Sequence, residues 1–182
     1  MPLDPLAQAF LDMLAAQPTP KLWQMPPEAG RMAFSSMMNL VGPKDVSIGK
    51  VENLTMPGPG GDIALRAYTP VAAGGEALPV VVFFHGGGMV AGSIETHDRI
   101  CAALAQMTGC RLVSVDYRLA PEHKFPAAVE DAIAATRWVS EHAASLGIDA
   151  TKLVVGGDSA GATLAAVVCQ EASRNAGPPI LL

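Results

Sequence analysis

Residues 154–164 constrain this chain more than any other stretch, because an apolar run breaks at glycines, presents one serine and then resumes with helical spacing. The pattern predicts a strand that turns sharply into a helix at Ser159. A serine on so tight a turn has a strained backbone and needs small neighbours, which Gly157 and Gly161 supply. We expect the helix start to leave unpaired N–H groups beside the serine, one of them donated by Ala160.

A second glycine run, Gly86, Gly87 and Gly88, follows a predicted buried strand that ends at His85. Glycines let a backbone approach a reacting atom closely, so we expect Gly87 and Gly88 to add two N–H donors around the oxyanion that forms at an attacked carbonyl. A phosphate-binding loop is disfavoured, because no Gly-Lys-Ser/Thr end follows. The serine turn and the glycine run, in this order and each after a strand, indicate a serine hydrolase.

From residue 78 onwards, strand and helix signals alternate. Continuous β-branched and aromatic runs are typical of strands buried on both faces, as in a parallel sheet. The predicted strands span 78–85, 111–116 and 152–156, the helices span 96–109, 126–142 and 159–174, and another strand opens at 178. This alternation predicts the α/β class, with a doubly wound, mostly parallel sheet and a site beyond the carboxyl ends of its strands.

Two finer expectations concern the chain before and after the first buried strand. Residues 46–57 and 61–70 alternate around a Gly-Pro-Gly-Gly turn and predict an antiparallel pair. Thr96 is expected to cap the helix that follows it. The side of that helix expected to face the core carries Ile100, Ala103, Leu104 and Met107.

The first 45 residues are rich in methionine and precede every strand signal. Helices are predicted over 3–16 and from Pro27 through residue 38. One interpretation is a helical extension packed on the core. The other, which we favour for the region, is a cap over a pocket for an apolar acyl group. We therefore divide the chain into a helical cap region, 1–45, and a region of the catalytic domain, 46–182. The candidate pocket residues are Leu22, Trp23, Met25, Phe34, Met37 and Met38.

Composition excludes several classes of function. The 182 residues are half hydrophobic, enough for one sizeable core, and their net charge of −5 without a Lys/Arg cluster argues against nucleic acid as a partner. No apolar run approaches the ~20 residues of a membrane span and no secretory signal opens the chain, so we expect a cytoplasmic protein. Cys101, Cys110 and Cys169 lack metal-like spacing and are interpreted as buried thiols, and no metal or organic cofactor is implied.

Four segments in order resemble the hormone-sensitive lipase family, the family IV bacterial carboxylesterases of the α/β-hydrolase fold. They are HGGG at 85–88, DYRLAPE at 116–122, FPAA at 125–128 and GDSAG at 157–161. The likeness is close over 80–182 and looser before. It implies Ser159 as the nucleophile and N-terminal helices as part of a cap. The oxyanion donors that it implies are Gly87, Gly88 and Ala160.

The resemblance gives the neighbouring polar residues supporting roles. His85 is interpreted as an orienting hydrogen-bond partner and not as a base, and Gly86 and Asp158 as further supporting residues. The DYRLAPE segment is expected to shape the loop beside the site. Its Asp116, Arg118 and Glu122 are therefore interpreted as structural hydrogen-bonding and ion-pair partners.

The histidines depart from the family's order. An α/β-hydrolase carries serine, acid and histidine in that sequence, whereas the histidines here, at 85, 97, 123 and 142, all precede Ser159, and Glu171 is the only acid after it. A serine without a base is a poor nucleophile. We therefore expect the triad acid and base on a C-terminal portion of roughly 100 further residues. His97 and His123 could lie near the mouth of the site, but we interpret them as solvated loop residues.

The sequence thus predicts a carboxylesterase that hydrolyses short to medium acyl esters through an acyl-enzyme on Ser159, with this portion alone expected to be inactive. Two alternatives stay open: a catalytically silent hydrolase-fold protein that binds a small acyl ligand, and an amidase or deacetylase on the same machinery. The partners that the sequence leaves open are a small-molecule ester, a second copy of the chain and a C-terminal portion of the same protein.

Overall fold

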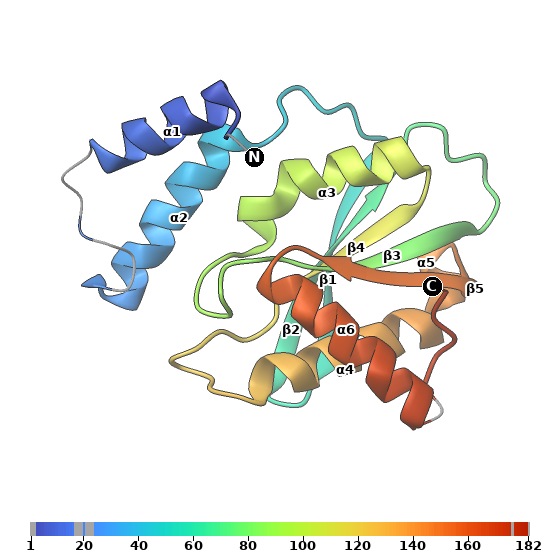
Figure 1. Cartoon of the computed structure of the whole chain (residues 1–182). Helices are drawn as coiled ribbons and strands as arrows, with labels where there is room; N and C mark the ends of the chain where they lie inside the picture. The colour runs from blue at the N-terminus through green and yellow to red at the C-terminus, as the bar shows by residue number, and fades with distance from the viewer. Residues whose placement is uncertain (1–2, 17–19, 21–23, 176, 182) are drawn as a thin grey trace.

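The computed structural model describes residues 3–16, 20, 24–175 and 177–181. Two helices and three strands precede an alternation of helices and strands, as predicted (Figure 1). None of the described helices is long and apolar enough to cross a membrane. The helices are α1 (Pro5–Ala15), α2 (Pro27–Val41), α3 (Ile94–Thr108), α4 (Ala127–Glu141), α5 (Ala143–Leu146) and α6 (Ala160–Arg174), and the strands are β1 (Lys50–Gly58), β2 (Gly61–Thr69), β3 (Leu78–Phe84), β4 (Arg111–Val115) and β5 (Ile148–Gly157).

The strands form one mixed sheet in the order β1-β2-β4-β3-β5. β1 and β2 make the predicted antiparallel hairpin, with Gly58 opposite Gly61, and β2 pairs with β4 in the antiparallel sense. β3 lies between β4 and β5 and is parallel to both, which confirms the predicted parallel part of the sheet. Ile180 forms a parallel bridge with Leu153 of β5, where the sequence predicts that another strand opens.

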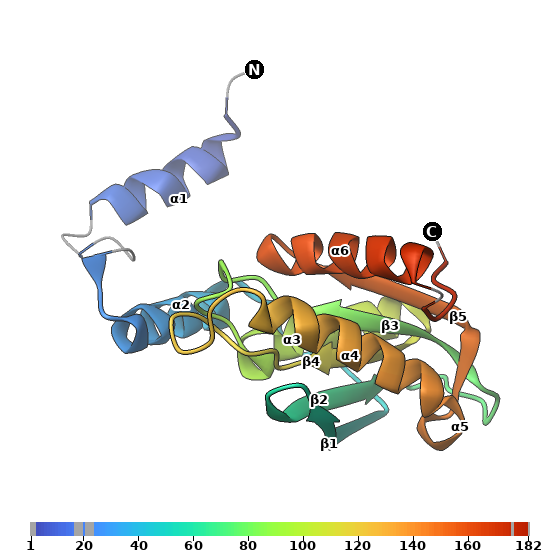
Figure 2. The same cartoon turned by 90° about the horizontal axis from the view of Figure 1, so that it is seen from below.

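Alternation along β3 separates two cores. Val80, Val82 and Phe84 belong to the core beneath α4 and α6, whereas Phe83 belongs to a smaller core beneath α3. Figures 1 and 2 show α3 on one face of the sheet and α4 and α6 on the other. A strand in the middle of such a sandwich must be apolar on both sides, which explains its continuous hydrophobic run.

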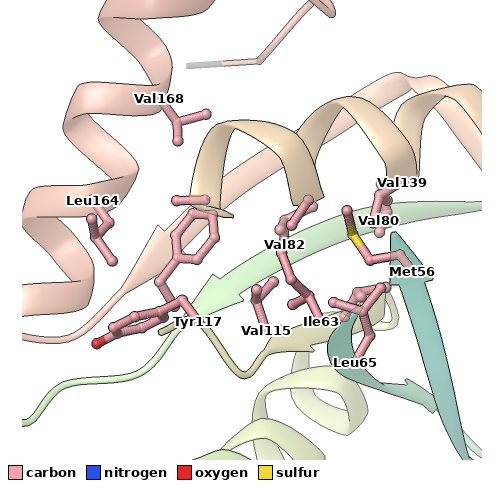
Figure 3. Close-up of a cluster of buried hydrophobic side chains, with 14 of the residues drawn as sticks. Met56, Ile63, Leu65, Val80, Val82, Val115, Tyr117, Val139, Leu164 and Val168 are labelled. Atoms are coloured by element: carbon pink, nitrogen blue, oxygen red, sulfur yellow. The ribbon is translucent and has the colours of Figure 1, made fainter. Parts of the chain in front are cut away.

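The larger core joins all five strands to α4 and α6, and Figure 3 shows Leu164 and Val168 of α6 pointing toward the sheet. Both side chains are buried, and so is Val139 of α4. Each such side chain contributes about 1.5–3 kcal/mol through the area it removes from water. This packing holds the start of α6 against the end of β3.

α3 begins earlier than predicted. Its N-cap is Ser93, whose hydroxyl accepts from the N–H of Thr96 at 3.3 Å, while Oγ1 of Thr96 accepts from the N–H of Ser93 at 2.9 Å. Thr96 is therefore the reciprocal partner in a capping box and not the cap. Two hydroxyl residues three positions apart carry the same signal, which is why the sequence alone placed the cap wrongly.

The face of α3 that meets the sheet also differs from the prediction, which was wrong. Leu104 and Met107 are 36% and 83% exposed. The buried side instead contains His97, at helical spacing from the apolar residues of that side. Because the histidine was treated as polar, the buried face was not recognised. The buried residues of α3 are Ile94, His97, Cys101, Ala102 and Ala105.

The N-terminal helices differ from each other. Oδ1 of Asp4 caps α1 by accepting from the N–H of Leu6 at 2.8 Å, yet every residue of this helix is exposed, and Figure 2 shows it apart from the sheet. The interpretation of an extension packed on the core is therefore wrong for α1. α2 does contact α3. The exposed apolar side chains on and beside α1 are Leu3, Leu6, Phe10, Leu11, Met13 and Leu14.

The segment after β4 makes the structural contacts expected of it. Nε and Nη2 of Arg118 donate to the carboxylate of Asp131 at 2.8–3.0 Å, and the Asp131 side chain is fully buried. Oδ1 of Asp116 accepts from the N–H of Ile94 at 3.3 Å, and Glu122 pairs with Arg31 of α2 at 2.6 Å. These contacts attach the loop to α3, α4 and α2 together.

Removing the Arg118 guanidinium should destabilise the fold, because the buried Asp131 carboxylate would lose its ion-pair partner. We expect Arg118→Met to lower the free energy of unfolding by about 3 kcal/mol in urea denaturation. Arg118→Lys should recover part of this loss, since lysine restores the charge but not the two-pronged geometry. Lys124→Met, at an exposed loop position, is the control, and an equal effect of both methionine variants would contradict the prediction.

Candidate active site

Ser159 lies on the strand-to-helix turn that the sequence predicts. β5 ends at Gly157, α6 begins at Ala160, and Ser159 between them has φ 51° and ψ −116°. A residue other than glycine at positive φ stores roughly 1–3 kcal/mol of strain, which persists only where the surroundings hold it. Ser159 is also exposed, so a strained hydroxyl-bearing residue is presented to solvent.

Two glycines allow this turn to approach the end of β3. A β-carbon on Gly157 would lie 2.3 Å from the carbonyl oxygen of Phe84, and one on Gly161 would lie 1.9 Å from the same oxygen. The obstacle is a backbone atom of a buried strand and cannot move aside as a flexible side chain would. The close approach to the Phe84 carbonyl therefore explains why small residues are needed on both flanks of Ser159.

The glycine run lies directly against the serine turn. The N–H of Gly86 donates to Oδ1 of Asp158, the residue before Ser159, at 2.8 Å. Gly87 and Gly88 have φ of 124° and 67°, values that side-chain-bearing residues rarely adopt. One hydrogen bond thus joins the two segments that the sequence predicts to act together.

The N–H groups available near Ser159 follow from these local structures. The carbonyl of Gly87 accepts from Val90 and Ala91, which makes the glycine run a tight turn. Ala160 is the first residue of α6, and the N–H groups of a first helical turn have no acceptor within the helix. The predicted donors of Gly87, Gly88 and Ala160 therefore all belong to the segments that meet at Ser159.

His85 is fully buried beneath the glycine run. Its Nδ1 lies 2.9 Å from the carbonyl oxygen of Gly86, and its ring stacks on Tyr117 with centroids 4.3 Å apart. Tyr117 donates its hydroxyl hydrogen to the carbonyl of His85 at 2.6 Å. Burial lowers the pKa of His85 to about 4, because the charged ring would lose its hydration. These contacts agree with an orienting role.

His97 contradicts the interpretation of a solvated loop residue. It is fully buried in α3, and its Nε2 lies 3.2 Å from Oδ1 of Asp158. Its ring is near those of Phe34, Phe83 and His85, with centroid distances of 6.4, 6.3 and 5.5 Å. The signal that could have found it is its position four residues before the buried Cys101 on the same helix face.

The carboxylate of Asp158 is held ionised in this setting. Burial alone would raise its pKa, but His97 and the N–H of Gly86 favour the charged form, and the pKa is lowered. The side chain is 51% exposed. A negative charge therefore lies one residue from the serine, with donors on its inner side.

An apolar cavity of about 410 Å³ lies between α2 and the glycine run. Met25 and Phe34, two of the candidate pocket residues, line it, whereas Met37 and Met38 are half-buried on α2 and do not. Leu22 and Trp23 lie outside the described residues. The full lining is Met25, Pro27, Gly30, Arg31, Phe34, Gly87, Val90 and Ala91.

Arg31 holds the two walls of this cavity together. Its Nε donates to the carbonyl of Val90 at 2.7 Å and its Nη2 to the carbonyl of Ala120 at 3.0 Å. The guanidinium also binds both carboxylate oxygens of Glu122, at 3.0 and 2.6 Å, which lowers the pKa of Glu122 to about 2. The helix of the cap region is therefore attached to the backbone beside the site.

The remaining polar groups do not converge on Ser159. His123 and His142 are exposed, and His142 stacks on Trp138 at the end of α4. Among the residues that the structure describes, no histidine is hydrogen-bonded to Oγ of Ser159, and no three His, Cys, Asp or Glu side chains are grouped as metal ligands would be. A larger cavity of about 590 Å³ between α3 and the chain before β1 contains neither Ser159 nor the glycine run.

Comparison with known proteins places these features in a family. Residues 81–182 match a family described by the alpha/beta hydrolase fold. The chain is 51% identical over 133 residues to esterase LipI of Mycobacterium tuberculosis, a match that covers 72% of this chain and 42% of LipI. The chain thus spans less than half the length of that relative.

Two solved structures share the arrangement. A hyperthermophilic esterase from the archaeon Pyrobaculum calidifontis superposes with a TM-score of 0.90 at 45% identity, over 99% of this chain and 57% of that one. An ester hydrolase from the metagenome of Lake Arreo, solved with a derivative of bipyridine phosphonate, superposes with a TM-score of 0.93 at 41% identity, over 97% of this chain and 57% of that one.

Burial of His85 predicts a pH dependence of stability. Its pKa is about 4 in the folded protein and about 6.5 when unfolded, so the unfolded chain binds more protons between these values. Stability present above pH 6.5 should therefore be lost as the pH falls toward 4, by about 3 kcal/mol in total. Urea unfolding at several pH values measures this loss.

The control for this prediction is a second pair of unfolding curves. His85→Gln lacks the titrating ring and should show a shallower pH dependence than the wild type, whereas His123→Gln, at an exposed position, should follow the wild type. Parallel curves for the wild type and His85→Gln would contradict the prediction.

Proposed function

This chain belongs to the alpha/beta hydrolase fold family, and within it to the family IV esterases that resemble hormone-sensitive lipase. From that membership we propose that its protein hydrolyses carboxylic esters through an acyl-enzyme on Ser159. The observation that carries the proposal is the strained Ser159 turn joined to the glycine run by the hydrogen bond from Gly86 to Asp158. A hydroxyl and a set of backbone donors then face one carbonyl group.

In the proposed reaction, Oγ of Ser159 attacks the ester carbonyl carbon and the carbonyl oxygen takes the negative charge. The N–H groups of Gly87, Gly88 and Ala160 stabilise that oxyanion, and each donor is worth about 3 kcal/mol of transition-state stabilisation. Collapse of the intermediate breaks the bond to the alcohol and leaves an ester on Ser159. Water then attacks this ester, releases the carboxylic acid and restores the hydroxyl.

The proton of Ser159 needs an acceptor during attack. His85 faces Gly86 and Tyr117, and His97 faces Asp158, so neither ring is directed at Oγ of Ser159. In α/β-hydrolases the acid and histidine follow the serine along the chain. The base in this proposal is therefore a histidine outside these 182 residues.

The apolar cavity beside Gly87 is the proposed acyl site. Its walls combine Met25 and Phe34 of the cap region with Val90 and Ala91 of the glycine turn, and a volume of about 410 Å³ suits a short to medium acyl chain. A cytoplasmic location and pairing with a second copy stay predictions from the sequence.

Substitution of the nucleophile tests the function. In the full-length product of the gene, Ser159→Ala should lower kcat for 4-nitrophenyl butanoate by about 10⁴-fold or more and abolish labelling by a fluorophosphonate. Ser145→Ala, at an exposed serine of α5, should change neither. Turnover retained by Ser159→Ala would overturn the proposal, and a wild type that binds esters without turnover would favour the silent ligand-binding protein.

The acyl site is tested by two methionines of the cap region. Met25→Ala should raise KM for a hexanoyl ester by about threefold to tenfold, because apolar contact with the chain is lost, while KM for an acetyl ester changes less. Met37→Ala is the matched control, since Met37 lies on α2 but does not line the cavity. Equal effects of the two variants, or of either variant on both esters, would contradict this assignment.

A further inference from the structure

His97 has no role in the reaction described above, yet its Nε2 lies 3.2 Å from Asp158, the residue before the proposed nucleophile. The ring is fully buried, with the rings of Phe34 and His85 as neighbours. A buried imidazole is costly unless its nitrogens have partners. Its Nδ1 lies 2.8 Å from Oγ1 of Thr96 and its Nε2 3.2 Å from Oδ1 of Asp158.

The surrounding groups determine which nitrogen carries the hydrogen. Nε2 lies 3.2 Å from Oδ1 of Asp158 without the geometry of a hydrogen bond, and the negative charge beside it favours a hydrogen on Nε2 over a bare lone pair. Nδ1 then accepts the hydroxyl hydrogen of Thr96 at 2.8 Å, in competition with the carbonyl oxygen of Ser93 at 2.9 Å, while the Thr96 oxygen accepts from the N–H of Ser93 at 2.9 Å. The capping box of α3 and the histidine thus form one polarised chain that ends on Asp158.

Asp158 connects this chain to both parts of the proposed site. Its Oδ1 accepts from the N–H of Gly86, one residue before Gly87, and its backbone leads directly into Ser159. The carboxylate is half exposed and would be free to rotate into water if Gly86 were its only partner. Nε2 of His97, 3.2 Å away on the inner side, favours one direction of the carboxylate through the attraction of its N–H for the negative charge.

We propose that His97 is a positioning residue, which acts through Asp158 to hold the glycine run and the Ser159 turn in one arrangement. The expected effect on kcat rests on the proposed function, whereas the arrangement of His97 and Asp158 does not. Loss of the ring should misplace the oxyanion donors relative to Oγ of Ser159, and so affect the chemical step more than the binding of the ester.

The tautomer is the direct test, and it needs no turnover. In ¹⁵N spectra of the imidazole nitrogens of the folded protein, assigned by loss of the signals in His97→Gln, Nε2 of His97 should carry the hydrogen and Nδ1 should not. A hydrogen on Nδ1 and none on Nε2 would overturn the proposal, whether or not the protein hydrolyses esters.

Kinetics supply the second test, with kcat expressed per serine titrated by a fluorophosphonate so that unfolded protein is not counted. His97→Leu should lower kcat by roughly 10- to 100-fold and leave KM within about threefold. His97→Gln, which keeps a donor near Asp158, should recover most of the loss, and His123→Gln should match the wild type. An unchanged kcat per titrated serine in His97→Leu, or no recovery in His97→Gln, would overturn the positioning role.

The two proposals fail in different ways. A wild type without turnover, whose His97 still carries its hydrogen on Nε2, would remove the esterase function and leave the geometry standing. Full activity of both His97 variants would leave the esterase and remove the positioning role. Because the tautomer measurement does not depend on His97→Leu, a folding failure of that variant does not prevent the test.

Discussion

The close approach of the β5–α6 turn to the carbonyl of Phe84 is the contact on which the rest of this structure depends. Phe84 ends β3, and the next residues along the chain are His85 and the glycine run. Packing the turn onto that carbonyl is therefore sufficient to bring Ser159 beside the glycines. Gly157 and Gly161 make this contact sterically allowed, and buried side chains of α6 such as Leu164 supply the free energy that maintains it.

Polar contacts then refine an arrangement that apolar packing has already produced. The hydrogen bond between Gly86 and Asp158 sets the distance between the two loops, and Arg31 does the same for the cap helix and the backbone at Val90. Exposed ion pairs contribute little free energy by themselves. Their value here is geometric, because a planar guanidinium bound to two carbonyls and a carboxylate leaves α2 few alternative positions over the cavity.

Local patterns predicted most of the fold and of the candidate site. The turn at Ser159 could be predicted from the spacing of its glycines, and the β1–β2 hairpin from the two-residue alternation of its strands. The buried face of α3 could not be predicted from the sequence. A histidine is ordinarily expected to face solvent, and only the structure shows that His97 is buried beside Asp158. Likewise, the sequence gives Met25 and Met37 the same character, and only the placement of α2 against the glycine run separates them.

The positive φ of Ser159 has a consequence for how this protein would lose function. The turn is kept in an unfavourable conformation by its neighbours, so any loosening of that packing lets the serine relax to an ordinary backbone angle before the sheet comes apart. Mild heating or dilute denaturant should therefore displace the proposed nucleophile while circular dichroism still reports an intact fold. Inactivation and melting would then be two separate events on one temperature scale.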